Sequence, residues 1–197
     1  MATSSRRRGR GACLSFLGVL ALFIPWPGTA SLAFGSAPLG AGLGRRGLLG
    51  LVPAAGADDG KKRNLDASEM AKIVRQDLVE RQFLATADFS PEIYDESCTF
   101  TDEIDSYQKD KFIKGTKALF VGSESQVNLV GDVEVLEGGK KLQFRFAETL
   151  AFNFPLIHPK VTLSGTCTLT RGEDGLIVAY REKWDQSVPE VLLSGRL

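Results

Sequence analysis

Four consecutive segments in the C-terminal half of the chain alternate apolar and polar residues, and this pattern constrains the fold more than any other feature. Alternation with a period of two is typical of β-strands that bury one face. Turn-forming sequences, among them Glu137-Gly138-Gly139, separate the segments and favour antiparallel connections. The segments cover residues 125–139, 140–155, 158–175 and 175–187.

The residues before these strands show helical periodicity instead. Met70, Val74 and Leu78 recur at the spacing of one helix face within residues 66–87, and Asp66 or Ser68 could cap the start. We expect one helix of about twenty residues there, a short strand over residues 98–104 and a second, shorter helix within residues 106–122. Helices followed by antiparallel strands indicate an α+β fold, with N-terminal helices packed on a curved antiparallel sheet of about four to six strands.

The first 57 residues differ from the rest because they contain arginine but no acidic residue. Residues 1–33 have a basic start, an apolar run and a small-residue end, the layout of a secretory signal peptide; a membrane anchor is the alternative. Residues 34–57 have the composition of a plastid transit peptide and contain Arg45-Arg46, typical of a twin-arginine lumen signal. We therefore expect a linker over residues 58–65, one domain over 66–190 and a tail over 191–197.

The order of these segments, with Phe34 directly after the first cleavage point, resembles the bipartite plastid leaders of algae with secondary plastids. It implies a plastid protein, with the thylakoid lumen favoured and the stroma as the alternative. From Asp58 onward the chain holds all 24 acidic residues but only 18 of the 24 basic ones. This negative balance argues against nucleic-acid binding, and we expect no membrane span in the mature chain.

Two stretches resemble the SnoaL-like branch of the nuclear transport factor 2-like superfamily, in particular a group of plant, algal and cyanobacterial members. They are YDESCTFTDEIDSYQKDKFIKG (94–115) and VTLSGTCTLTRGEDGLIVAYREKWDQS (161–187). The shared pattern is Tyr-Asp before a strand ending Phe-x-Asp, then Ser-Gly-Thr, then Gly-Leu-Ile leading to Trp-Asp. The resemblance implies a cone with a pocket at its open end and a homodimer through the open sheet face.

Two carboxylates are candidates for catalysis. Glu148 interrupts an otherwise apolar stripe, and a carboxyl group in an apolar pocket has a raised pKa that suits a general acid or base. Glu148 could instead lie near the mouth or pair with Arg181. Asp102 shares a strand face with Cys98 and Phe100, and the resemblance implies that an acid lining the cone takes a proton or orients water. The alternative for Asp102 is that it caps the following turn.

Aromatic side chains dominate the same stripe and are the candidates for binding a ligand. On the last strand, alternation separates Tyr180, Glu182 and Trp184 from Arg181 and Lys183, but both faces mix apolar and charged residues, so the pocket-lining face stays open. The resemblance implies a His near the position of Tyr180, and its absence weakens a His-dependent mechanism. The candidate ligand-binding residues are Tyr94, Phe100, Phe144, Phe146, Phe152, Tyr180 and Trp184.

Metal and cofactor binding have little support in the sequence. His158, next to Pro159, is expected at a turn, and Cys98 and Cys167 lack metal-binding spacing. These two cysteines could form a disulfide in an oxidising lumen or remain buried thiols. No glycine-rich phosphate loop is present, so we expect neither a metal nor a nucleotide cofactor.

Two functions remain. The favoured hypothesis is a non-catalytic module that binds an apolar small molecule or docks on a thylakoid protein complex, because the chain lacks a complete catalytic set. The alternative is a cofactor-free isomerase, hydratase or cyclase that uses Asp102 and Glu148, with Tyr94 or Tyr180 as hydrogen-bond donor.

Overall fold

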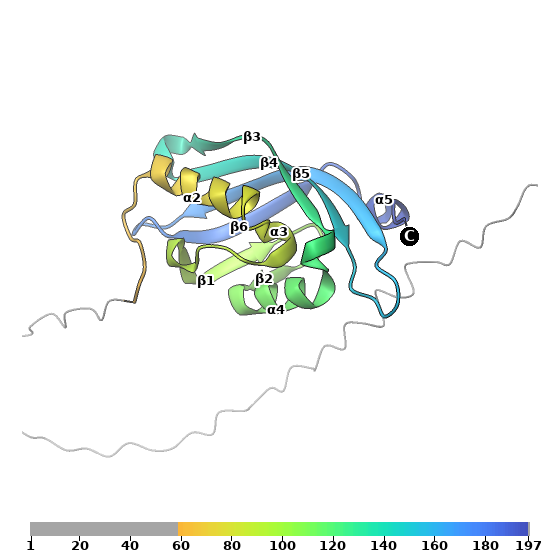
Figure 1. Cartoon of the computed structure of the whole chain (residues 1–197). Helices are drawn as coiled ribbons and strands as arrows, with labels where there is room; N and C mark the ends of the chain where they lie inside the picture. The colour runs from red at the N-terminus through yellow and green to blue at the C-terminus, as the bar shows by residue number, and fades with distance from the viewer. Residues whose placement is uncertain (1–58, 197) are drawn as a thin grey trace, which may run out of the picture. The chain divides into compact units, whose positions relative to one another are not determined.

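The computed structural model describes residues 59–196 (Figure 1). The predicted signal peptide, transit segment and twin-arginine motif lie outside the described residues. Among the helices between residues 59 and 196, none has the length and apolar character needed to cross a bilayer.

The described residues form one six-stranded sheet, and the predicted α+β fold is confirmed. The strand order is β2-β1-β6-β5-β4-β3. The four long strands follow one another antiparallel, as expected, whereas β1 and β6 pair in parallel. The strands are β1 (Tyr94–Thr101), β2 (Ser106–Gln108), β3 (Gln126–Leu136), β4 (Lys141–Ala151), β5 (Lys160–Arg171) and β6 (Ile177–Trp184).

Helices cover the sheet and its lower edge in Figure 1. The helix α2 packs beside β3, while α4 contacts β1 and β2. The α-helices are α2 (Ala67–Val79), α3 (Phe83–Thr86), α4 (Lys109–Leu119) and α5 (Val188–Leu193), and short 3-10 turns cover Pro91–Ile93, Gly122–Glu124 and Glu137–Gly139.

The prediction of one continuous helix over residues 66–87 is wrong. Asp66 caps α2 through a bond from the Ser68 amide, as expected, but α2 ends at Val79. The chain breaks at Gln82, whose φ of 57° is left-handed, before α3 begins. The Gln82 side chain stabilises this break, because its amide nitrogen donates to the Leu78, Val79 and Val127 carbonyls and its oxygen accepts from the Val127 amide. Tertiary bonding to β3 therefore overrides helical periodicity.

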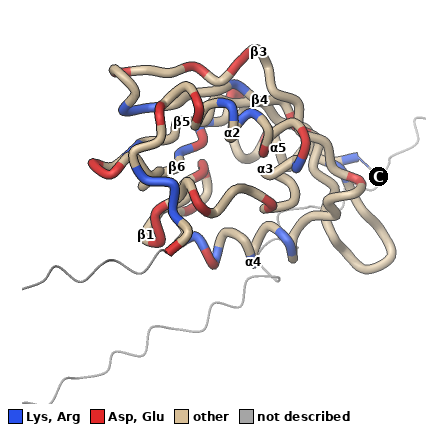
Figure 2. Tube along the Cα trace, turned by 60° about the vertical axis from the view of Figure 1, so that its left-hand side comes forward, with Lys and Arg blue, Asp and Glu red and all other residues tan. Residues whose placement is uncertain are grey.

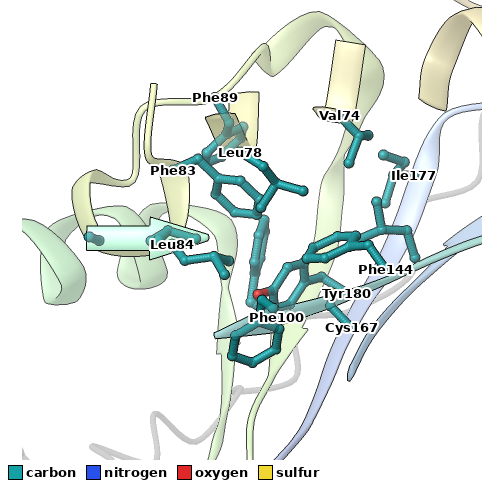
Figure 3. Close-up of a cluster of buried hydrophobic side chains, with 14 of the residues drawn as sticks. Val74, Leu78, Phe83, Leu84, Phe89, Phe100, Phe144, Cys167, Ile177 and Tyr180 are labelled. Carbon is teal, nitrogen blue, oxygen red and sulfur yellow. The ribbon is translucent and has the colours of Figure 1, made fainter. Parts of the chain in front are cut away.

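The core lies between α2, α3 and the inner face of the sheet. Figure 3 shows Val74 and Leu78 of α2 and Phe83 of α3 facing Phe144, Cys167 and Tyr180 of the strands. The alternation predicted for β4 is confirmed, because Leu142, Phe144, Phe146, Glu148 and Leu150 are all buried. On β6, Tyr180 and Glu182 are buried and Arg181 is exposed. The sequence could not decide which face of this strand points inward, and the structure shows that it is the face of Tyr180 and Glu182.

Both ends of the described chain pack onto the domain. Near the start, Lys61 donates to the Pro91 and Tyr94 carbonyls. At the other end, Val191 and Leu192 of α5 are buried, and Arg196 forms a β-bridge with Lys160. The packed unit thus includes residues on both sides of the predicted 66–190 range.

Candidate acid–base site

Two buried glutamates face the inside of the sheet from strands on either side of β5. Glu148 of β4 is 5% exposed and Glu182 of β6 is 8% exposed. Glu148 pairs in register with Leu163, and Glu182 pairs with Cys167, so Gly165 lies between them on the inner face of β5. Because Gly165 has no side chain, the tip of the Phe146 ring lies only 3.0 Å from where its Cβ would be.

Glu182 is held by two donors from its own strand. The Tyr180 hydroxyl donates to Glu182 Oε1, and the Trp184 indole Nε1 donates to Oε2 at 3.0 Å. The pKa of Glu182 is raised above its ordinary value, because burial outweighs the opposing effect of the bonds from Trp184 and Tyr180. Hydrogen bonds to the ionised form favour that form, so the donors stabilise a carboxylate at this position.

No such hydrogen-bond donors are recorded for the carboxyl group of Glu148 among the described residues. Within the part of the chain that the structure describes, its buried Oε2 has no hydrogen-bond partner. Burial, and secondarily the charge of Glu182, raise the pKa of Glu148 well above its usual range. The expected alternative, a pair with Arg181, is not formed, because Arg181 lies on the exposed face of β6. A carboxyl group in such surroundings favours the protonated form.

Asp102 lies just beyond the end of β1 and serves the turn, as one of the two sequence hypotheses expected. Its Oδ1 accepts from the Ile104 amide at 2.7 Å and the Asp105 amide at 2.8 Å. Burial is the main cause of the raised pKa of Asp102. Its charge also contributes to the raised pKa of Glu182, so Asp102 belongs to the electrostatic surroundings of the site.

The predicted ligand-binding aromatics are part of the core. Phe100 stacks on Tyr180 with ring centroids 5.0 Å apart and on Phe112 of α4 at 4.3 Å. Trp184 is half-buried, and the other six are buried: Tyr94, Phe100, Phe144, Phe146, Phe152 and Tyr180. The aromatic side chains therefore pack against one another in the described conformation.

The two cysteines of residues 59–196, Cys98 and Cys167, are both free and buried. Cys98 is on β1 and Cys167 on β5, and β6 separates the two strands. Two strand spacings amount to roughly 9–10 Å, beyond the reach of a disulfide, so the disulfide alternative is wrong for this structure. No group of three or more His, Cys, Asp or Glu residues suited to a metal occurs between residues 59 and 196.

His158 lies in the β4–β5 connection, as predicted for a turn residue. Its Nδ1 is 2.7 Å from Oε1 of Glu124. This position is in a connection rather than on the strand faces that carry the two buried glutamates.

Glu182 is a functional residue that the sequence did not predict. Its neighbours in the alternation, Tyr180 and Trp184, were selected, and both contact its carboxylate. An acid between two aromatic hydrogen-bond donors on one strand face is the pattern that identifies it. The ambiguity of β6, where both faces mix apolar and charged residues, hid that pattern.

Comparisons with known proteins identify the fold. No protein-family model matches the sequence, and no curated protein matches it significantly. A SnoaL-like polyketide cyclase from Jannaschia sp. CCS1 superposes with a TM-score of 0.50 at 14% identity, covering 68% of this chain and 95% of that one.

Two further solved structures are similar at lower scores. A nuclear transport factor 2-like protein from Salmonella enterica has a TM-score of 0.45 at 10% identity, covering 62% of this chain and 92% of its own. An LEH-like epoxide hydrolase from M. tuberculosis has a TM-score of 0.44 at 12% identity, covering 64% and 92%. The fold assignment rests on the first of the three structures: the chain has the cone fold of the SnoaL-like polyketide cyclase.

Proposed function

We propose that the protein is a cofactor-free acid–base enzyme, of the isomerase, hydratase or cyclase class, acting on a small and largely apolar substrate. The observation that carries this proposal is the buried pair of Glu148 and Glu182 with an unpartnered carboxyl oxygen on Glu148. Buried polar groups are normally hydrogen-bonded, so an orphaned carboxyl oxygen is a candidate point of contact with a substrate.

The two carboxyl groups have unequal surroundings, which assigns their roles. Glu182 receives bonds from Tyr180 and Trp184 and is the carboxylate that removes a proton from carbon or from water. Glu148 has no such donors and keeps its proton, so it is the acid that protonates a substrate oxygen or carbon. Pairs of carboxyl groups whose surroundings separate their pKa values are a general means of acid–base catalysis.

The aromatic surroundings set the substrate class. Phe146 lies over Gly165 between the glutamates, and Phe100 stacks on Tyr180 beside them. A site lined by phenylalanine rings favours an apolar molecule with few polar groups. Because these rings pack against one another, they must separate to admit a substrate, and Phe112 of α4, which stacks on Phe100, is only half-buried.

A probe reaction tests the proposal without knowledge of the substrate. The probe is 5-nitrobenzisoxazole, whose ring opens to a cyanophenolate when a carboxylate in an apolar site removes its carbon-bound proton. We expect the full chain to accelerate this reaction beyond free acetate at equal concentration. Glu182→Gln should lower the rate at least about tenfold, since general bases contribute on that scale or more.

The matched control is Glu134→Gln, because Glu134 is an exposed glutamate on β3. Its rate should equal that of the wild type. A wild-type rate no higher than that of acetate, or equal rates in Glu182→Gln and Glu134→Gln, would contradict the proposed catalytic role.

A second candidate is a module that binds an apolar molecule without converting it or docks on a thylakoid complex. The self-packed aromatic interior favours the docking form, because the rings occupy the interior themselves. Phe152 and Phe154 extend this interior, with ring centroids 5.6 Å apart. Native mass spectrometry of protein isolated from its source distinguishes the two candidates. A retained small molecule with no turnover of the probe supports the binding module, whereas turnover supports the enzyme.

The leader supports a proposal on location: the thylakoid lumen of a plastid, with the stroma as the alternative. Its support is the order of a signal-peptide layout, an acid-free segment and Arg45-Arg46 before Ala55-Gly56-Ala57. N-terminal sequencing of the natural protein tests it. We expect the mature chain to begin near Asp58. A mature chain that begins near Phe34 would contradict the location in the lumen but would leave the location in the plastid standing.

A further inference from the structure

The connection between β4 and β5 ends in an apolar tip, defined as residues 155–157. Leu156 is 102% exposed and Ile157 is 50% exposed, and Pro155 is exposed beside them. Leu156 has a φ of 71°, in the left-handed region that side chains other than glycine seldom adopt. In Figure 1 the connection extends beyond the sheet next to α4. Water-exposed apolar residues gathered at one protruding turn indicate a contact surface.

The base of this tip is held firmly by neighbouring elements. The Asn153 amide donates to the Leu119 carbonyl at 2.9 Å, and Phe120 forms a β-bridge with Phe152. On the other side, His158 contacts Glu124 at 2.7 Å. Because both sides are bonded, the tip is presented outward in a fixed direction.

Basic side chains flank the tip on both sides. Lys114 and Lys117 are exposed on α4, one turn apart and so on one helix face, and α4 ends at Leu119, which contacts the base of the tip. Across the tip, exposed Lys160 bridges to Arg196. The salt bridges of residues 59–196 include neither Lys114 nor Lys117. Figure 2 shows the connection in tan, with blue segments on α4.

We propose that the β4–β5 tip docks on a lipid bilayer with anionic headgroups. Leu156 and Ile157 enter the boundary between headgroups and acyl chains, and the lysines on either side contact the headgroup phosphates. The charge of the site selects this partner, because the domain as a whole is acidic whereas the exposed lysines beside the tip outnumber its one acidic neighbour named above, Glu124. Apolar side chains with neighbouring basic residues are the general pattern of reversible interfacial binding.

A fluorescent reporter at the tip tests this proposal in the full chain. The variant is Leu156→Trp, and its emission is read as the difference from wild type because the chain also has Trp26 and Trp184. The probes are vesicles of phosphatidylcholine mixed with phosphatidylglycerol, and vesicles of phosphatidylcholine alone. A local reporter is needed because the leader has its own apolar run. We expect a blue shift with the mixed vesicles, weakened by added salt.

The matched control is Ile104→Trp, because Ile104 is 51% exposed in the β1–β2 turn, much as Ile157 is at the tip. It should show no shift. In the Leu156→Trp background, Lys114→Gln and Lys117→Gln should each weaken the apparent vesicle affinity about fivefold.

Three results would overturn the docking proposal: no shift at position 156, an equal shift at position 104, or a shift that depends on protein concentration without vesicles. The last result would indicate a second copy of the chain as the partner. None of these results depends on turnover, so they leave the catalytic proposal unaffected.

Discussion

Glu148 and Glu182 lie on the inner face of the sheet on opposite sides of β5, and the charge of Glu182 adds to burial in raising the pKa of Glu148. Glu182 has two hydrogen-bond donors, whereas Oε2 of Glu148 has no partner among the described residues. Burial raises the pKa of both groups, but only Glu182 has donors that offset part of this rise, so ionisation is favoured more at Glu182 than at Glu148.

The substitution Glu148→Gln should change how stability depends on pH. The ordinary pKa of a glutamate is 4.5, and burial raises the pKa of Glu148 in the folded protein. As the pH rises above 4.5, the unfolded chain releases this proton while the folded protein retains it, so wild-type stability declines. The variant has no such proton, so its free energy of unfolding does not decline for this reason. Between pH 4.5 and about pH 7, the difference in free energy of unfolding between Glu148→Gln and wild type should shift in favour of the variant by roughly 1–3 kcal/mol.

Urea unfolding across that pH range measures the gain, with Glu134→Gln as the exposed control. The difference between Glu148→Gln and wild type should widen as the pH rises. A difference that stays constant would mean that Glu148 titrates alike in the folded and unfolded chains.

Gly165→Ala should destabilise the domain, because the site depends on close packing at this glycine. An added Cβ would lie 2.5 Å from the Lys183 carbonyl oxygen and 3.0 Å from the Phe146 ring. Overpacking of this kind costs about 1–3 kcal/mol. Gly115→Ala on α4 is the control, since a Cβ there meets nothing within 4 Å, and it should stabilise by about 0.5–1 kcal/mol. Thermal unfolding of both variants checks the prediction, and similar transition temperatures would refute it.

Gln82→Ala should loosen the junction between the α2–α3 break and β3. The variant loses both bonds to the Val127 backbone, one donated by the Gln82 amide and one accepted from the Val127 amide. We expect a loss of roughly 1–3 kcal/mol in the free energy of unfolding and faster hydrogen exchange at Val127. Gln76→Ala, which removes an exposed bond to Glu80, is the control and should have a much smaller effect. Equal losses in the free energy of unfolding in the two variants would show that the Gln82 bonds to Val127 stabilise the fold no more than an exposed hydrogen bond does.

The sheet was predictable from the sequence because alternation directly reports which residues share a strand face. Glu148 illustrates this, since its place in the apolar stripe of β4 predicted its burial. The helix break was not predictable, because residues 66–87 keep helical spacing and the break depends on bonds from Gln82 to Val127, which is distant in sequence.

The candidate site was predictable only in half. Alternation separated the two faces of β6 but could not orient them, because Arg181 and Glu182 are both charged and each has apolar neighbours on its face. Orientation comes from tertiary packing, in which Tyr180 stacks on Phe100 and brings Glu182 inside. The parallel pairing of β1 with β6 that creates this stack joins segments far apart in the chain.

A carboxyl ¹³C NMR titration of Glu148 in wild type and in Glu182→Gln tests the acid–base pair most directly. We expect a wild-type midpoint well above the ordinary value of 4.5, because burial disfavours the charged form. We expect a lower midpoint in Glu182→Gln, since that change removes the neighbouring negative charge. A Glu148 that titrates near 4.5, with the same midpoint in both proteins, would contradict the acid–base pair.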